Sequence, residues 1–191
     1  MDSVNILSDE QLKLLCRKGD YSAFEQLYHR HKDALFRFVF RQCGNEETSK
    51  DLFQDIWLNI HRACGNYSPD AKFTTWLYRI AHNKIIDYYR KTGKESLLSY
   101  EEQLTKETEL IGKEPQLQPE SLILELQLSE CLLNAIKSLK EAQREVALLH
   151  FEMGFSVSEI AEITQVNAET IKSRLRYAMN TLRKHLKQKL N

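Results

Sequence analysis

The 191-residue sequence contains few of the residues that interrupt helices, since Gly occurs 6 times and Pro 3 times. Few segments alternate apolar and polar side chains with the period of two that strands show. We therefore expect a nearly all-helical protein rather than a turn-rich β fold. Hydrophobic residues make up 42% of the chain and charged residues 28%, which is ordinary for a globular protein with a buried core.

Long apolar runs are also missing from the sequence. A helix that crosses a membrane needs roughly 20 consecutive, mostly apolar residues. Neither such a run nor a signal peptide is recognisable. We therefore expect a cytoplasmic protein with no segment inserted in a membrane.

Motifs for metals, cofactors and catalysis are scarce. The four cysteines have neither paired nor metal-type spacing, so we expect reduced thiols that fill the core. They are Cys16, Cys43, Cys64 and Cys131. His29 and His31 stand two apart on an expected helix and so point away from each other, which argues against a metal site. Because no Gly-rich phosphate loop, carboxylate pair or nucleophile–base motif is present, we expect no cofactor and no enzymatic activity.

The net charge is zero, but the charges are segregated along the chain. Residues 168–191 contain seven Lys or Arg and one acidic residue, and residues 76–94 contain five Lys or Arg and one acidic residue. Residues 95–120 contain seven Glu and two Lys. Local charge matters more than the sum for binding nucleic acid, so the two basic blocks are candidate nucleic-acid surfaces.

The segment 156–186 predicts two helices joined by a short turn. Ser156 and Glu159 have the spacing of a capping box, and Asn167 is suited to cap the second helix after a turn at 164–166. Apolar residues three and four apart predict the buried side of the second helix: Ile171, Leu175, Ala178 and Leu182. This is the pattern of a helix-turn-helix, whose second helix can enter a DNA major groove. A helical hairpin with a solvated basic face is the alternative.

Four helices are expected in the first half, at about 8–19, 20–44, 46–64 and 73–91. The third has a largely acidic face that also carries one large apolar residue, Leu58. Such a face is usually only solvated, yet it also suits a protein partner. In the fourth, aromatic residues interleave with basic ones, which suits single-stranded nucleic acid because rings stack on bases at roughly 1–3 kcal/mol per base. These aromatics could equally belong to a core.

A Glu-rich segment with Gly and Pro, residues 93–120, has the composition of a linker. Helices expected at 122–139 and 141–151 would support the helix-turn-helix. The sequence therefore predicts an all-α protein of two small helical domains, residues 1–92 and 121–191, joined by a flexible acidic linker.

Three blocks in register resemble the bacterial RNA polymerase sigma factors of the sigma-70 family: DLFQDIWLNI, FTTWLYRIAHNKIIDYYRK and REVALLHFEMGFSVSEIAEITQVNAETIKSRL. The small extracytoplasmic-function (ECF) group, which keeps only regions two and four, is most similar, and the resemblance covers residues 20–91 and 125–186. It implies a subunit that binds core polymerase and directs promoter-specific initiation. The partners it implies are the clamp helices of the largest polymerase subunit, the flap of the second-largest subunit, promoter DNA and an anti-sigma factor.

The resemblance also assigns roles to individual residues. It implies that the acidic helix docks on core polymerase through Asp51, Gln54, Asp55, Trp57 and Leu58. It implies that the promoter −10 element is read and melted, with one base leaving the stack for a protein pocket, by Asn66, Tyr67, Phe73, Trp76, Arg79, Asn83 and Arg90. Trp76 is as compatible with a core position as with melting. It implies that the helix-turn-helix, residues 156–177, reads the −35 element through Glu169, Thr170, Lys172, Ser173, Arg174 and Arg176.

Two departures from the family pattern matter. Lys140 stands where the family usually has Pro, so we expect the next helix to begin less firmly. Tyr177-Ala178-Met179 replaces a frequent Arg-Ala-Arg, which removes two cations and predicts weak −35 binding without polymerase. The alternative function is a helix-turn-helix regulator that binds a palindromic site as a dimer, but it leaves the acidic face and the first basic block without a role.

Overall fold

The computed structural model describes residues 7–64, 72–93 and 131–190, with side chains described up to residue 187. Its named helices are α1 (Asp9–Arg17), α2 (Tyr21–Cys43), α3 (Glu46–Ala63), α4 (Phe73–Lys91), α6 (Glu141–Ala147), α7 (Val157–Thr164) and α8 (Ala168–Leu190). A π-helical segment, Leu148–Glu152, continues α6, and residues 131–138 are helical. These ranges contain no β-strand, so the predicted all-α fold is confirmed. The predicted linker, apart from Gly93, and the start of the helix expected at 122–139 lie outside the described residues.

The ends of the first helices are fixed by local capping residues. Ser8 and Gln11 form a reciprocal capping box at the start of α1. Asp20 caps α2 by accepting hydrogen bonds from two backbone N–H groups of its first turn. Gly44 ends α2 with a φ of 70°, a left-handed conformation that glycine adopts without the steric cost of a Cβ atom.

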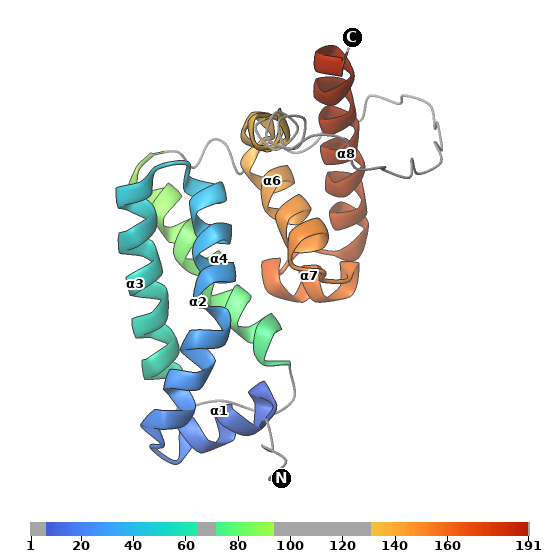
Figure 1. Cartoon of the computed structure of the whole chain (residues 1–191). Helices are drawn as coiled ribbons and strands as arrows, with labels where there is room; N and C mark the ends of the chain where they lie inside the picture. The colour runs from blue at the N-terminus through green and yellow to red at the C-terminus, as the bar shows by residue number, and fades with distance from the viewer. Residues whose placement is uncertain (1–6, 65–71, 94–130, 191) are drawn as a thin grey trace, which may run out of the picture.

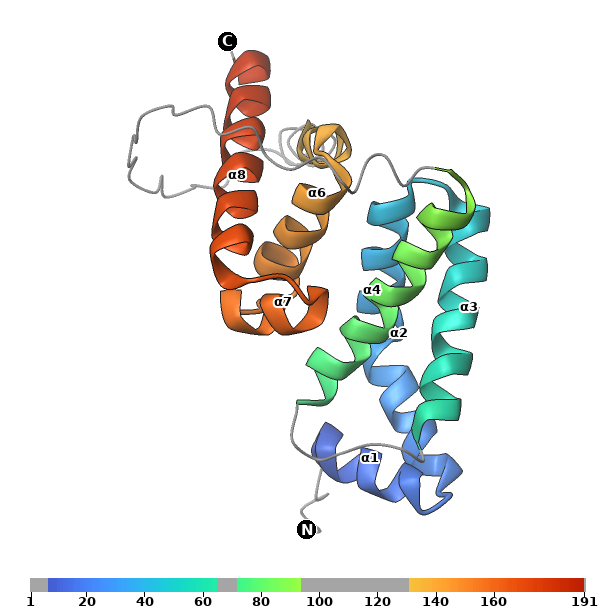
Figure 2. The same cartoon turned by 180° about the vertical axis from the view of Figure 1, so that it is seen from behind.

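The first half is a bundle of α2, α3 and α4, with α1 lying across one end (Figures 1 and 2). The predicted stripes of α3 and α4 are buried in it: Leu52, Ile56, Ile60, Leu77, Ala81 and Ile85. Each large apolar side chain removed from water contributes roughly 1.5–3 kcal/mol. The buried side chains therefore hold α3 and α4 in place, and the sides of these two helices that are not buried form part of the surface of the bundle.

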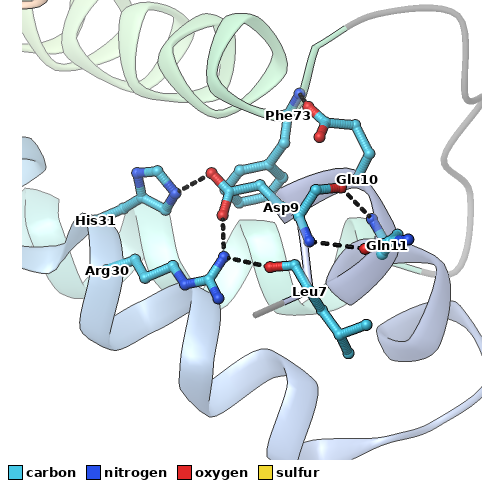
Figure 3. Close-up of polar contacts among 8 residues, drawn as sticks. Leu7, Asp9, Glu10, Gln11, Arg30, His31 and Phe73 are labelled. Carbon is cyan, nitrogen blue, oxygen red and sulfur yellow. Dashed lines mark hydrogen bonds and ion pairs between the residues drawn. The ribbon is translucent and has the colours of Figure 1, made fainter. Parts of the chain in front are cut away.

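Polar contacts fix α1 to its neighbours, as Figure 3 shows. The Asp9 carboxylate accepts a hydrogen bond from Arg30 at 2.9 Å and lies 2.6 Å from His31 Nε2. The Glu10 carboxylate accepts a hydrogen bond from the Phe73 backbone N–H at 3.3 Å. These contacts tie α1 to α2 and to the start of α4. No cluster of His, Cys, Asp or Glu suited to a metal ion occurs among the residues with described placement.

The second half packs α6, α7 and α8 around a small apolar core (Figure 1). Ile160 and Ile163 from α7 and Ile171 and Ala178 from α8 are buried there, while Leu175 is half-buried. The predicted buried side of the helix-turn-helix is thus confirmed.

The two halves touch mainly through α4, the helix of the first bundle that packs against α7 (Figures 1 and 2). The Tyr78 ring packs edge-on against Phe155, with 5.2 Å between ring centroids, and its hydroxyl donates to Met153 Sδ at 2.8 Å. The sequence predicts two domains on a tether. In the structure their described parts share a continuous hydrophobic core, because α4 carries apolar side chains on two of its sides.

Candidate nucleic-acid and partner interfaces

The predicted helix-turn-helix is present with its capping signals. Ser156 and Glu159 form a capping box at α7, and Gln165, with a φ of 59°, turns the chain after it. The Asn167 side chain accepts a hydrogen bond from the Thr170 N–H at 2.8 Å and so caps α8. This short turn packs α8 against α7 and leaves the first turns of α8 at the surface.

The six residues predicted for the −35 element lie on this part of α8, and none is buried. Glu169, Lys172 and Arg176 are exposed, whereas Thr170, Ser173 and Arg174 are half-buried. Lys172 Nζ donates to Glu169 at 2.7 Å, so these side chains are paired on the surface of the helix. Arg174 lies close enough to His82 of α4 for its charge to act on the pKa of that histidine. The surface is therefore basic, but one of its edges faces the first half.

Tyr177, which replaces a common family cation, is half-buried, and Ala178 is fully buried. The Arg176 guanidinium lies over the Tyr177 ring, 5.5 Å from its centroid. Tyr177 therefore packs on the helix surface and adds no positive charge to it.

The exposed side of α4 carries Arg79, Asn83 and Arg90, three of the residues predicted for the −10 element. Arg90 lies 4.0 Å from Asp87 one turn earlier. Beside Asn83, α3 and α4 enclose an open depression with a volume of about 360 Å³. It is lined by Asn59, Arg62, Ala63, Ile80, Asn83, Lys84 and Asp87. Its lining is thus largely apolar, with two amide groups, two cations and the Asp87 carboxylate among the lining residues.

Sequence patterns alone did not identify this depression. Asn59 and Arg62 contribute to it from the last two turns of α3, next to the side of the helix that is buried. Only the packing of α3 against α4 brings them beside Asn83. A search for polar residues on both helices at the rim of their contact could have found them.

Trp76 is half-buried, and the Lys13 ammonium lies over its ring. This position is intermediate between the two interpretations that the sequence left open. Phe73 is fully buried, and its ring is tilted against His31 of α2. Its contact with DNA stays a prediction, and it would require the ring to leave this position. Asn66 and Tyr67 lie outside the described residues.

Helix α3, which carries the predicted acidic face, lies on the side of the first bundle away from α6, α7 and α8 (Figures 1 and 2). Asp51, Gln54, Asp55 and Leu58 are all exposed, and the Leu58 side chain is 52% exposed. Lys84 of α4 lies 3.4 Å from Asp55. The acidic surface therefore borders the basic side of α4 directly.

Trp57 does not belong to that surface. It is only 6% exposed and packs edge-on against Phe24 and Tyr28 of α2. The contact of Trp57 with a partner therefore stays a prediction, and in this conformation its ring offers almost no exposed surface for it. Its position follows from the helical period, since Trp57 lies beside Ile56 and Ile60 on the buried side of α3.

Charged contacts join the two halves, and sequence patterns gave no sign of them. Glu152 pairs with Arg37 and Arg41 of α2. Lys72 Nζ, at the start of α4, donates to Glu159 of α7 at 2.8 Å. All these residues come from segments far apart in the chain, so their pairing depends on how the halves pack.

A nearly buried pair lies in the same contact. His82 Nδ1 of α4 is 2.6 Å from a carboxylate oxygen of Glu145 in α6. Burial alone would lower the pKa of His82, and so does the charge of Arg174. The Glu145 charge and hydrogen bond outweigh both and raise the pKa of His82. The pair therefore favours a protonated histidine between the halves.

The start of α6 is secured by Arg144. Lys140 makes no side-chain capping hydrogen bond. Arg144 instead donates hydrogen bonds to four backbone carbonyls, those of Gln42, Ile136, Lys137 and Leu139. The expectation that α6 begins less firmly stays a prediction, but a guanidinium with five N–H donors holds the preceding turn together and joins it to α2.

No helix in the described ranges is both long enough and apolar enough to cross a membrane. Comparison with known proteins gives two family matches. The family described as Sigma-70 region 2 matches residues 27–95, and the family described as Sigma-70, region 4 matches residues 129–182.

Individual relatives agree with these matches. The ECF RNA polymerase sigma factor SigW of Bacillus subtilis is 30% identical over 175 residues, which cover 90% of this chain and 92% of SigW. The solved structure of the sigma factor RpoE with the anti-sigma factor NepR, from Bartonella quintana, has a TM-score of 0.64 at 27% identity and covers 86% of this chain and 96% of that one. CnrH in complex with the cytosolic domain of CnrY has a TM-score of 0.67 at 24% identity, covering 94% and 97%, and shows likeness of fold alone.

Proposed function

Because the chain belongs to the ECF group of the sigma-70 family, we propose that its three surfaces divide the work of promoter-specific initiation. The protein is a sigma factor: it binds core RNA polymerase and directs transcription from promoters. The proposal concerns which residues perform each step. It keeps the predicted division into residues 1–92, 93–120 and 121–191.

The acidic face of α3 is the proposed docking surface for core polymerase. Leu58 supplies an exposed apolar contact, and Asp51 and Asp55 supply charge around it. An acidic surface meeting a basic one gains orientation and association rate, while the buried apolar residue slows dissociation. Gln54 lies on the same face, whereas Trp57 supports the surface from behind.

The depression beside Asn83 is the proposed pocket for the −10 base that leaves the stack. This assignment is supported by a largely apolar lining that also carries the Asn59 and Asn83 amides, the Arg62 and Lys84 cations and the Asp87 carboxylate. A base removed from a duplex loses stacking energy, which contacts with its polar edge and its faces can return. Arg79 and Arg90 are exposed on the same helix and would contact the phosphates of the single strand.

The exposed start of α8 is the proposed reader of the −35 element. Lys172 and Arg176 are the exposed cations there, and either can bind a guanine edge or a phosphate. Because Arg174 faces the first half, we infer that the halves must separate before α8 can use it fully. Weak binding by the free protein follows from this arrangement.

The proposed partners beyond DNA are the clamp helices of the largest polymerase subunit and the flap of the second-largest subunit. An anti-sigma factor is a further proposed partner, because the similar RpoE structure contains one. We propose that the protein works in the cytoplasm, where its polymerase is, and that it has no enzymatic activity alone. The dimeric-regulator alternative is not favoured, because both family matches belong to sigma factors.

The observation that carries the proposal is the presence, in one described fold, of an exposed acidic face, a depression lined by both apolar and hydrogen-bonding groups, and a basic helix-turn-helix. The experiment is to reconstitute holoenzyme from purified core polymerase and this protein and to map transcript starts on genomic DNA. Specific starts that share sequences near −10 and −35 are the expected result. Tight binding of a dimer to duplex DNA, with no effect of core polymerase, would instead favour the regulator.

A further inference from the structure

Helix α4 begins without a capping side chain of its own. Lys72 precedes it and makes no side-chain hydrogen bond to its first turn. That turn, Phe73-Thr74-Thr75-Trp76, contains no acidic residue either. A helix start leaves backbone N–H groups without partners inside the helix, and its partial positive charge favours a nearby anion rather than a lysine. The start of α4 therefore depends on groups from other segments of the chain.

Glu10 of α1 is one of these groups. Its carboxylate accepts a hydrogen bond from the Phe73 backbone N–H at 3.3 Å, as Figure 3 shows. The hydrogen bond from its own backbone N–H lowers the pKa of Glu10, burial opposes this, and the Phe73 N–H lowers the pKa further. The side chain is therefore an anion at neutral pH. Glu10 does for α4, from a different helix, what Asp20 does for α2 next to it in sequence.

Helix α1 holds this carboxylate in place. Asp9, the neighbour of Glu10, accepts a hydrogen bond from Arg30 of α2 at 2.9 Å. Lys13 follows Glu10 by three positions on the same side of α1, and its fully buried side chain places Nζ 2.7 Å from the centroid of the Trp76 ring. Helix α1 thus contacts both the first backbone N–H of α4 and a ring one turn later.

We propose that Glu10 is a positioning residue for promoter opening, because it caps the opening helix α4 from α1. This inference rests on the proposed role of α4. The capped first turn precedes Arg79 and Asn83, so the cap keeps the helix that carries them formed before DNA arrives. Order that exists before binding reduces the conformational entropy lost on binding.

The first test measures amide hydrogen exchange in the free, full-length protein. Glu10→Ala removes the acceptor, whereas Glu10→Gln keeps a carbonyl oxygen without the charge. We expect Glu10→Ala to speed exchange at Phe73 and Trp76 roughly fivefold or more, as the loss of a helix cap does. The Trp76 N–H is included because it makes the first bond within the helix, to the Lys72 carbonyl. Exchange in α8 should not change, and Glu10→Gln should restore most of the protection.

The second test measures open complex by permanganate reactivity near −10, with holoenzyme made from each variant. Glu10→Ala should form roughly threefold less open complex or lower still, with unchanged affinity for core polymerase, and Glu10→Gln should recover most of it. Gln11→Ala is the matched control. It breaks the capping box at the start of α1 but leaves Glu10, so it should open promoters nearly normally.

Three results would overturn the proposal: unchanged exchange in Glu10→Ala, an equal loss of opening in Gln11→Ala, or restored exchange without restored opening in Glu10→Gln. Glu10 is exposed, so its variants are expected to fold. If Glu10→Ala does not, Glu10→Met keeps the stem, removes only the acceptor and decides the question.

Asn83→Ala separates this inference from the proposed function. If Asn83→Ala opens promoters poorly and Glu10→Ala opens them normally, only the positioning role of Glu10 fails. If Asn83→Ala and Arg79→Ala both open promoters normally, α4 is not the opening helix, and the proposed function fails whatever the exchange rates show.

Discussion

The Glu159 carboxylate accepts hydrogen bonds from two parts of the protein at once. One donor is the Lys72 ammonium at the start of α4, 2.8 Å away, and another is the Ser156 backbone N–H at the start of α7, 2.9 Å away. The Lys72 hydrogen bond, followed by those from Ser156, lowers the pKa of Glu159 to about 2. The residue that caps the first helix of the helix-turn-helix is therefore also a link between the two halves.

Glu159→Ala should lower the stability of the second half by about 1 kcal/mol, since it removes the side chain that completes the capping box with Ser156. Lys72→Met removes the contact between the halves but leaves the cap, so it should cost less. Because the pKa of Glu159 is lower in the folded protein, its contribution is present above the unfolded value near 4.5 and is lost as pH falls towards 2. Urea unfolding of both variants at pH 7 and pH 3 measures this. Equal losses at pH 7 would show that the cap contributes nothing of its own.

The His82–Glu145 pair predicts a contact between the halves that weakens with rising pH. The pKa of His82 is raised on folding, so its stabilising charge is present below the unfolded value near 6.5 and is lost as pH rises through the higher folded value. Arg174 of α8 also faces this histidine, and its charge reduces the shift. We expect the radius of gyration, measured by small-angle X-ray scattering, to increase from pH 6 to pH 8.5. His82→Gln should remove that increase, and a pH response that survives the substitution would assign it to other groups.

Arg144 predicts a larger effect on stability. Its guanidinium donates to four carbonyl oxygens, one of them on Gln42 of α2, which also accepts a hydrogen bond from the buried Tyr89 hydroxyl. Arg144→Met keeps most of the apolar stem but leaves these acceptors without their donor. We expect a loss of about 2–4 kcal/mol in the free energy of unfolding, because each charge-assisted hydrogen bond contributes about 1.5–3 kcal/mol and the losses overlap. Arg176→Met, on the exposed side of α8, is the matched control and should change stability by less than about 0.5 kcal/mol.

Local rules predicted the helices and their ends, because capping residues and apolar spacing act within a few positions. Asn167 caps α8 as its spacing predicted, and Ser8 and Gly44 end their helices by the same local rules. The same period could have placed Trp57 in the core, since it stands next to Ile56. The resemblance to known proteins suggested a surface role that the spacing did not.

What depends on packing between distant segments was not predictable. The depression beside Asn83 exists because α3 and α4 meet at one particular rotation, which puts Arg62 and Asn59 at its rim. The contact between the halves requires α4 to be apolar on two sides. The sequence does not distinguish Tyr78, which makes this contact, from an aromatic residue that packs within one amphipathic helix bundle. The pairing of His82 with Glu145 cannot be predicted from the spacing of residues along the sequence, because the two residues are brought together by packing between the halves.

Leu58 is predicted to contribute most to docking on core polymerase. Leu58→Ser should weaken binding by about tenfold or more, since burying a leucine contributes roughly 1.5–3 kcal/mol and 1.4 kcal/mol is a factor of ten. Its fold should be unaffected, because the side chain is 52% exposed. Leu14→Ser, at another exposed leucine of the first half, is the control and should bind normally. The measurement is a fluorescence titration with core polymerase. Equal affinities for the two variants would show that the docking surface does not include Leu58.

Asn83 is predicted to act in promoter opening rather than in polymerase binding. Asn83→Ala removes an amide from the rim of the depression without touching the acidic face of α3. A lost hydrogen bond contributes about 0.5–1.5 kcal/mol, so we expect roughly three- to tenfold less open complex, measured by permanganate reactivity of unpaired thymines near −10. Affinity for core polymerase should stay the same. Asn180→Ala, at an exposed asparagine of α8, should open promoters normally. The contrary outcome is that Asn83→Ala opens promoters as well as the unsubstituted protein, while Arg79→Ala opens them poorly. Phosphate contacts alone would then drive opening, and the depression would hold no base.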